Sequence, residues 1–157
     1  MVILNKAKPF LFLIGSFLLL LCSFRNIPSN YAINQSQNWL SPSWADTLVG
    51  PNLTNPSFIQ AGKSVYLGHC IVCHGANGKG DGESGFGLEV PPGDFTDAFT
   101  LNESDGALFW KITTGRGPMP PFLNKLSDNQ RWQVVAYLRE LQRNHKAKIR
   151  KTKIRKK

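Results

Sequence analysis

The sequence predicts an all-α domain over residues 57–142, because helical periodicity runs through this range and strand alternation does not. Three of its segments carry apolar residues three or four positions apart, the spacing of a helix that is buried on one face. Two of these segments also begin with a side chain that caps helices. The glycine- and proline-rich stretches between them are predicted to be long loops.

The three predicted helices are defined by their ends and their apolar faces. The first runs from Ser57 to a pair of cysteines. The second has Ser104 as its N-cap and stops at Gly115, a residue type that favours the left-handed conformation of helix ends. The third begins at Ser127, which forms a capping box with Gln130. The apolar faces are, in the same order, Phe58, Ala61, Gly62, Val65 and Tyr66; Leu108, Phe109 and Ile112; and Trp132, Val134, Val135, Leu138 and Leu141.

The loops make the expected core small. Residues 75–97 hold seven of the 14 glycines of the chain, and residues 115–126 are equally broken by glycine and proline. Short helices with such loops between them bury little apolar surface in a domain of this size. Something other than side chains is therefore expected to fill the centre of the domain.

Residues 1–25 are predicted to be a signal peptide or an uncleaved signal anchor. Lys6 and Lys8 precede an apolar run at residues 9–24, the order found in export signals. As a helix this run rises only about 24 Å, less than the roughly 30 Å hydrocarbon core of a membrane, which favours a signal peptide. No good small-residue cleavage site follows the run, which favours an anchor, so both interpretations stay open. The third cysteine, Cys22, is interpreted as an apolar residue of this run.

Residues 26–56 are predicted to form a linker between the leader and the domain. From residue 33 onward this stretch is rich in Asn, Ser and Pro and has neither helical nor strand period. Trp39 and Trp44 within it either pack back onto the domain or lie in a lipid interface, where tryptophan is enriched. The sequence does not separate these two alternatives.

The net charge of the chain, +9, is concentrated at its C-terminal end. Residues 57–142 carry seven basic and nine acidic side chains, whereas residues 143–157 carry nine basic and no acidic ones. The protein is therefore a mildly acidic domain followed by a basic C-terminal tail. Such tails are usually solvated, but this one suggests electrostatic attachment to an anionic membrane or to an acidic patch on a partner protein.

The sequence CIVCH at residues 70–74 admits three chemical interpretations. A zinc site needs four ligands, usually in two separated pairs, and no second pair accompanies His69, Cys70, Cys73 and His74. A redox-active thiol pair would accompany a strand–helix–strand pattern, which is missing. Covalent attachment of a c-type haem fits the spacing, because on one helical turn Cys70 and Cys73 project to the same side and can bond two vinyl groups. His74 follows directly and can ligate the iron.

Met119 is the candidate for the opposite side of the iron. Apart from Met1 it is the only methionine, and it lies in the sequence GRGPMPPF. A single methionine more often fills a core than binds a metal. This one is flanked by Pro118 and Pro120 in a loop, where a stiff backbone can hold a thioether in place. Ligation of haem by histidine and methionine is typical of electron-transfer cytochromes.

The runs GKSVYLGHCIVCHGANGKGDGESGFGLEVPPGDFTD, GRGPMPPF and LSDNQRWQVVAYLREL together resemble the class I cytochrome c family, in the form of the small bacterial single-haem domains. The resemblance covers residues 57–142. It implies the class I cytochrome c fold, with three to four helices around one covalently bound haem c. It also implies haem attachment at Cys70 and Cys73 and axial ligation by His74 and Met119.

Further residues are assigned only through this resemblance. The first and last helices are expected to cross closely, at Gly62 and Tyr66 on one and Tyr137 and Leu138 on the other. A proline carbonyl is expected to accept the second ring N–H of the axial histidine, with Pro91 and Pro92 as candidates. Arg116 and Trp110 are candidates for contacts with the haem propionates, and a solvated arginine and a core tryptophan are the equal alternatives.

The function implied by the resemblance is one-electron transfer between respiratory or photosynthetic complexes, and not an enzymatic reaction. The expected location is the periplasm or an equivalent space, and the expected partners are donor and acceptor complexes, with the N-terminal segment or the basic tail as an alternative contact to a membrane. Nucleic acid is not an expected partner.

Two alternatives stay open: a haem enzyme or gas sensor that releases Met119, and a haem subunit of a larger membrane redox complex. The domain lacks a distal acid–base pair that would support the enzyme, because His69 belongs to the attachment turn and His145 to the tail.

Overall fold

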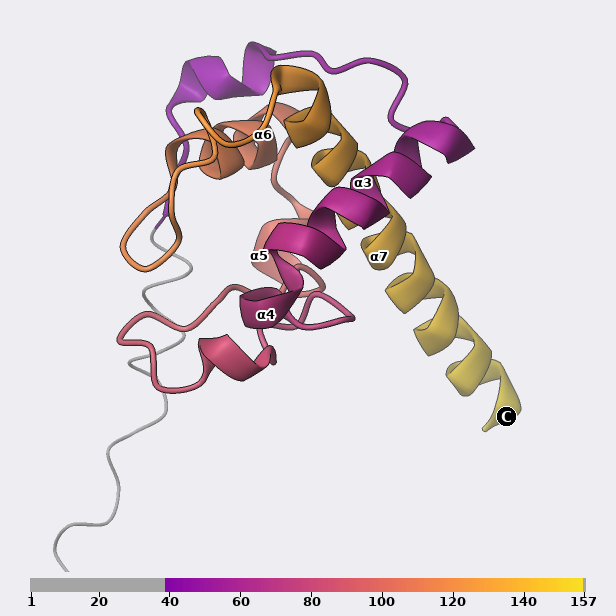
Figure 1. The fold of residues 1–157 in the computed structure, drawn as a ribbon. Helices are drawn as coiled ribbons and strands as arrows, with labels where there is room; N and C mark the ends of the chain where they lie inside the picture. The colour runs from indigo at the N-terminus through magenta and orange to yellow at the C-terminus, as the bar shows by residue number, and fades with distance from the viewer. Residues whose placement is uncertain (1–38, 157) are drawn as a thin grey trace, which may run out of the picture. The chain divides into compact units, whose positions relative to one another are not determined.

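Five α-helices and two short 3-10 helices make up the regular structure of residues 39–156, the part of the chain that this computed structural model describes (Figure 1). The predicted all-α class is confirmed, and residues 39–156 contain no β-strand. The predicted leader at 1–25 and the first part of the predicted linker lie outside the described residues. In chain order the elements are η2 (Ser43–Thr47), α3 (Pro56–His69), α4 (Ile71–His74), η3 (Glu83–Gly85), α5 (Ala98–Leu101), α6 (Asp105–Thr114) and α7 (Asp128–Arg155).

The three predicted helices correspond to α3, α6 and α7. Helix α6 starts at its predicted N-cap, where the Ser104 hydroxyl accepts a hydrogen bond from the Ala107 N–H at 3.0 Å. Helix α7 starts with the predicted capping box between Ser127 and Gln130. Helix α3 starts one residue before the prediction, because the Asn55 side chain accepts hydrogen bonds from the first turn and Pro56 stands at its first position.

Helices α3 and α7 cross closely, as the resemblance implies (Figure 1). A Cβ atom at Gly62 would overlap the carbonyl oxygen of Gln133, so only glycine permits this approach of the two backbones. One turn further along α3, the Tyr66 ring lies 5.2 Å from the ring of Tyr137. The crossing holds the end of α3, and with it the cysteine motif, against the core.

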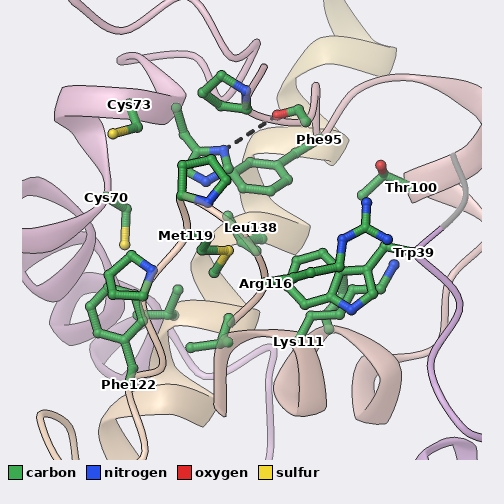
Figure 2. A pocket seen from close by; sticks show the side chains of 18 of the residues that line it. Trp39, Cys70, Cys73, Phe95, Thr100, Lys111, Arg116, Met119, Phe122 and Leu138 are labelled. Carbon is green, nitrogen blue, oxygen red and sulfur yellow. Dashed lines mark hydrogen bonds between the residues drawn. The ribbon is translucent and has the colours of Figure 1, made fainter. Parts of the chain in front are cut away.

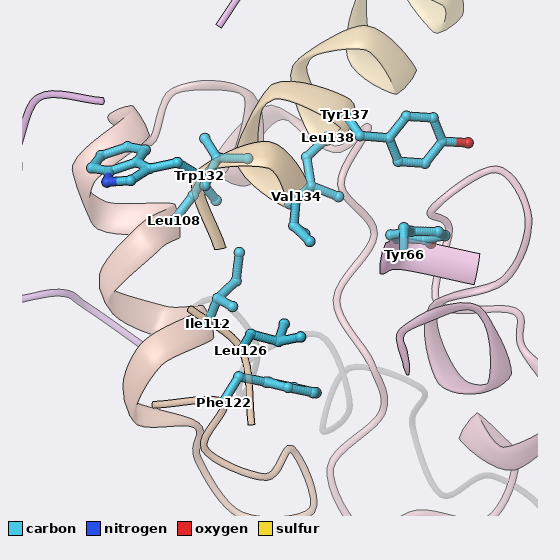
Figure 3. Packing of buried hydrophobic residues seen from close by; sticks show 10 residues of the cluster. Tyr66, Leu108, Ile112, Phe122, Leu126, Trp132, Val134, Tyr137 and Leu138 are labelled. Carbon is cyan, nitrogen blue, oxygen red and sulfur yellow. The ribbon is translucent and has the colours of Figure 1, made fainter. Parts of the chain in front are cut away.

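The core is built from α3, α6, α7 and the loop that follows α6 (Figure 3). Its buried apolar side chains come from the predicted stripes, together with Tyr137 of α7 and two residues of the loop. They are Tyr66, Leu108, Ile112, Phe122, Leu126, Trp132, Val134, Val135, Tyr137 and Leu138. None of these buried residues belongs to α4, η3 or α5, but Ile71 of α4 packs against the cluster from its edge.

The part of the predicted linker that the structure describes has a short helical turn and packs against the domain. Residues 43–47 form η2, and Ala45 within it is fully buried. Leu48 and Leu53 pack against the core. Burial here depends on the fit of single side chains to the domain, which leaves no periodic pattern in the sequence.

The basic tail continues α7 as helix up to Arg155, although its side chains are mostly exposed. Within residues 39–156, none of the helices combines the length and the apolar character that a membrane crossing requires.

Candidate functional site

A cavity of about 160 Å³ lies among α3, α4, α6, α7 and their loops. Protein interiors seldom contain voids much larger than a water molecule, so a cavity of this size is expected to receive something. The four site residues predicted from the sequence, Cys70, Cys73, His74 and Met119, all line it. Most of the other lining residues are apolar, among them Phe95, Phe122 and Leu138 (Figure 2).

The cysteine motif begins at Cys70, the C-cap of α3, and continues as the single turn of α4. The Cys70 N–H donates to the Tyr66 carbonyl at 2.8 Å, and the His74 N–H donates to the Cys70 carbonyl at 2.9 Å. Figure 2 shows the Cys70 and Cys73 sulfurs at the same side of the cavity, as the spacing predicted. Both cysteines that the structure describes are free thiols. Burial raises the pKa of the Cys70 thiol to about 12, so this sulfur is protonated at neutral pH.

The His74 ring is oriented by a backbone carbonyl. Its Nδ1 lies 3.3 Å from the Gly93 oxygen, and because a carbonyl can only accept, Nδ1 carries the proton and Nε2 is left as the lone-pair donor. Burial lowers the pKa of His74, although the bond to Gly93 opposes this shift. A neutral imidazole at pH 7 is the form that binds metals.

The predicted acceptor for this ring, the carbonyl of Pro91 or Pro92, is wrong by one residue. The Pro92 carbonyl is turned toward Gly80, where a side chain would overlap it. The next carbonyl, that of Gly93, therefore faces His74.

Met119 lies in a loop that is fixed to α6 by its backbone. Arg116 and Met119 exchange two hydrogen bonds of 3.0 and 3.1 Å across a tight turn at Gly117 and Pro118. Beyond this turn, the Phe122 N–H donates to the Ile112 carbonyl at 3.1 Å, and the Leu123 N–H donates to the Thr113 carbonyl at 3.2 Å. The thioether of Met119 thus points into the cavity from a loop with little freedom (Figure 2).

Comparison with known proteins agrees with this geometry. Residues 57–138 match the family model described as cytochrome c oxidase, cbb3-type, subunit III. The chain belongs to this family of cytochrome c domains. The match includes the cysteine motif and the Met119 loop and leaves out residues 39–56 and the basic tail.

Two curated proteins and one solved structure are similar to the cytochrome c domain. The cbb3-type cytochrome c oxidase subunit FixP of Rhizobium meliloti (strain 1021) is 32% identical over 90 residues, which are 56% of this chain and 29% of FixP. Cytochrome c6 of Parathermosynechococcus lividus is 29% identical over 77 residues, 49% of this chain and 83% of that protein. A chain of the Kuenenia stuttgartiensis reducing HAO-like protein complex superposes with a TM-score of 0.50 and 32% identity, covering 66% of this chain and 52% of that one. The chain thus spans less than a third of FixP and about half of the solved chain.

The residues around the cavity of this cytochrome c domain fit a haem c. Thiols, an imidazole with an available Nε2 and a thioether face a mostly apolar space. Among residues 39–156, no three His, Cys, Asp or Glu side chains cluster as ligands of a free metal ion. The donor set therefore suits the iron of a porphyrin better than a bare cation.

Polar residues gather on the side of the cavity away from the cysteines (Figure 2). Lys111 is buried there and paired with Glu103, and the Arg116 guanidinium lies 5.2 Å from the centre of the Trp39 ring. Burial and, to a smaller extent, Arg116 lower the pKa of Lys111 to about 8, so its ammonium is still mostly charged at pH 7. Trp110, the other candidate for the propionates, does not line the cavity and instead packs edge-on against Trp39 at 6.3 Å.

Sequence reasoning missed two residues that support His74. The Phe95 ring stacks on the His74 ring, with 4.5 Å between their centres and an angle of 20°. The Phe95 carbonyl accepts a 2.9 Å hydrogen bond from the Gln142 side chain, which is buried at the end of the apolar stripe of α7. No local pattern distinguishes Gln142 from the solvated residues that follow it, so only the fold reveals its contact with this loop.

Proposed function

We propose that the chain is a single-haem c-type cytochrome that carries one electron at a time between redox partner proteins. The observation that carries the proposal is that Cys70, Cys73, His74 and Met119, from two distant segments, line one cavity. Two thiols on one helical turn are the groups that covalent attachment of haem c requires. An imidazole and a thioether are the axial pair typical of electron-transfer cytochromes.

These four residues would have three roles. Cys70 and Cys73 would hold the haem through thioether bonds. His74 would ligate the iron through Nε2, since its Nδ1 is engaged by Gly93. Met119 would supply the sixth ligand from its loop. When bound, haem c supplies a one-electron couple between ferric and ferrous iron.

The fixed position of the Met119 loop favours electron transfer over chemistry at an open iron. Four backbone hydrogen bonds tie residues 116–123 to each other and to α6. An enzyme or gas sensor that releases Met119 would have to loosen this loop. A rigid site that rearranges little between oxidation states is what an electron carrier needs.

The proposed location is the periplasm or an equivalent extracytoplasmic space. The order of charge and apolar residues in 1–25 supports export. The partners are then respiratory or photosynthetic donor and acceptor complexes. The similarity to FixP, which is named as a subunit of a cbb3-type oxidase, makes a haem subunit of a larger membrane complex the second candidate. Co-purification of the native protein with a membrane oxidase would favour this second function.

Replacing Met119 by Ala tests the proposed ligation. The oxidised wild-type protein is expected to show the weak far-red absorption band of a thioether bound to ferric haem, and Met119→Ala should abolish it. The reduction potential should fall as well, because methionine ligation raises it and axial ligands shift haem potentials over about 0.8 V. Absorption spectroscopy and a redox titration measure both effects.

Leu123→Ala is the matched control, because Leu123 lies in the same loop and is largely exposed. The control should keep both the band and the potential of the wild type. An unchanged spectrum and potential in Met119→Ala would contradict methionine ligation and would favour an iron that is open or bound by another group.

A further inference from the structure

Residues 39–55 lie before the family domain, yet they are packed against it. Ala45 is fully buried, and a side chain at Gly106 of α6 would overlap the Ala45 carbonyl oxygen. The Ser104 hydroxyl, which caps α6, also donates a hydrogen bond to the Asp46 carboxylate. Further along, Gly50 lies directly against the Trp132 ring. The segment is thus attached to α6 and α7 by close contacts along its length.

Its first described residue, Trp39, reaches the cavity itself. The indole lines the polar side of the cavity and packs edge-on against Trp110. The Lys111 ammonium lies 5.5 Å and the Arg116 guanidinium 5.2 Å from the centre of a Trp39 ring. Cations at these distances are attracted to the face of an aromatic ring, and more strongly where water is excluded.

The other tryptophan of the segment behaves differently. Trp44, in η2, is 56% exposed and does not line the cavity. The sequence does not show which of the two tryptophans packs on the domain, but the structure does: Trp39 packs on it, whereas Trp44 faces outward. The two provide a matched pair within one segment.

We propose that residues 39–55 anchor a cover for the cofactor cavity: Trp39, the residue of this segment that lines the cavity, keeps water from the polar side of the cavity. The inference rests on the proposed function, because the cover acts on a bound haem. Trp39 shields the buried Lys111–Glu103 pair, whose charges would otherwise be hydrated. It also lowers the polarity around the haem.

The consequence for a bound haem is a higher reduction potential. Ferric haem carries one more positive charge than ferrous haem, and a dry surrounding disfavours the more charged form. Opening the polar side to water should stabilise the ferric state and lower the potential. Residues 39–55 thereby influence the reduction potential of the haem although they lie outside the family domain.

The test compares Trp39→Ala with Trp44→Ala in the full-length haem-loaded protein. Both variants should retain covalent haem and the far-red methionine band. Trp39→Ala should show a reduction potential shifted to a lower value, while Trp44→Ala should keep the wild-type value. Trp39→Phe retains an aromatic face toward Lys111 and Arg116 and should restore most of the wild-type potential. If Trp39→Ala does not accumulate, Trp39→Leu replaces it, with a shift in the same direction.

Equal potentials in the Trp39 variants, Trp44→Ala and the wild type would overturn the cover while leaving the proposed function intact. The same holds if Trp44→Ala shifts the potential as much as Trp39→Ala does. Absence of covalent haem from the wild-type protein would instead overturn the proposed function, and the cover with it.

Discussion

Residues 39–55 and residues 143–155 flank the same domain, but the first segment is largely irregular and packed, whereas the second is regular and exposed. The N-terminal flank has only one short 3-10 helix, yet it buries Ala45 and brings Trp39 to the cavity. The C-terminal flank is a continuous extension of α7, yet its two isoleucines, Ile149 and Ile154, are 44% and 68% exposed. Regular backbone and close packing are therefore independent properties in this protein.

The basic flank is helical because the helix is already formed where it begins. The first half of α7 is started by a capping box and held by the core, so adding residues costs no new nucleation. Cationic side chains near the C-terminal end of a helix interact favourably with its dipole. Repulsion between like charges one turn apart opposes this effect. The helical structure of the basic flank therefore depends on the first half of α7, which is held by the core.

The first prediction breaks the packing of the N-terminal flank. In Gly106→Ala the new Cβ overlaps the Ala45 carbonyl, and such overpacking lowers the free energy of unfolding by about 1–3 kcal/mol. Gly68→Ala is the control, because Gly68 is also helical but has open space around its Cβ position. This control should be up to about 1 kcal/mol more stable than the wild type, from helix propensity alone. Thermal unfolding measures both, and equal stability of the two variants would show that the flank does not pack on α6.

The second prediction concerns the C-terminal flank and expects no effect on the fold. Replacing the eight Lys and Arg residues of 146–157 by Gln should leave the unfolding temperature and the reduction potential unchanged, because none of those up to Lys156, where the described residues end, lines the cavity. Binding to vesicles with anionic lipid at low salt should be lost, since each basic residue near such a surface contributes about 1 kcal/mol. Zwitterionic vesicles are the control.

Salt provides the second control for this charged flank. Near 1 M salt the Debye length is only about 3 Å, so binding by the wild-type protein should also disappear. Equal binding by wild type and variant at low salt would mean that the basic flank is simply solvated. If the flank binds only an acidic redox partner, wild type and variant should again bind vesicles equally. The association rate of the wild type with that partner should then depend on salt.

The features predicted from the sequence are those with a local signal. All three predicted helices are confirmed. Their signals, the capping residues Ser104 and Ser127 and the apolar stripes, each consist of residues that are close together in the sequence. The cysteine motif and the Met119 loop likewise carry their chemistry in short stretches, which is why both were expected at one cavity before the fold was known.

The features that escaped prediction depend on contacts between distant segments. Trp39 reaches Lys111, and Gln142 reaches Phe95, although neither pair is close in sequence. The histidine acceptor was missed by one residue because the direction of a loop carbonyl depends on what lies beside it, here Gly80. Short α5 was also missed, since one turn capped by Asp97 has no period to detect.

The central claim is that Cys70 and Cys73 carry a covalently attached haem c, and denaturing electrophoresis of the full-length protein, stained for haem, tests it most directly. Thioether bonds survive denaturation, so the haem should migrate with the wild-type chain and should resist acid extraction. The variant in which both cysteines are replaced by Ala should show no haem in its band and should yield little folded protein. Complete extraction of haem from the wild-type chain by acid, with none left in its band, would contradict the account.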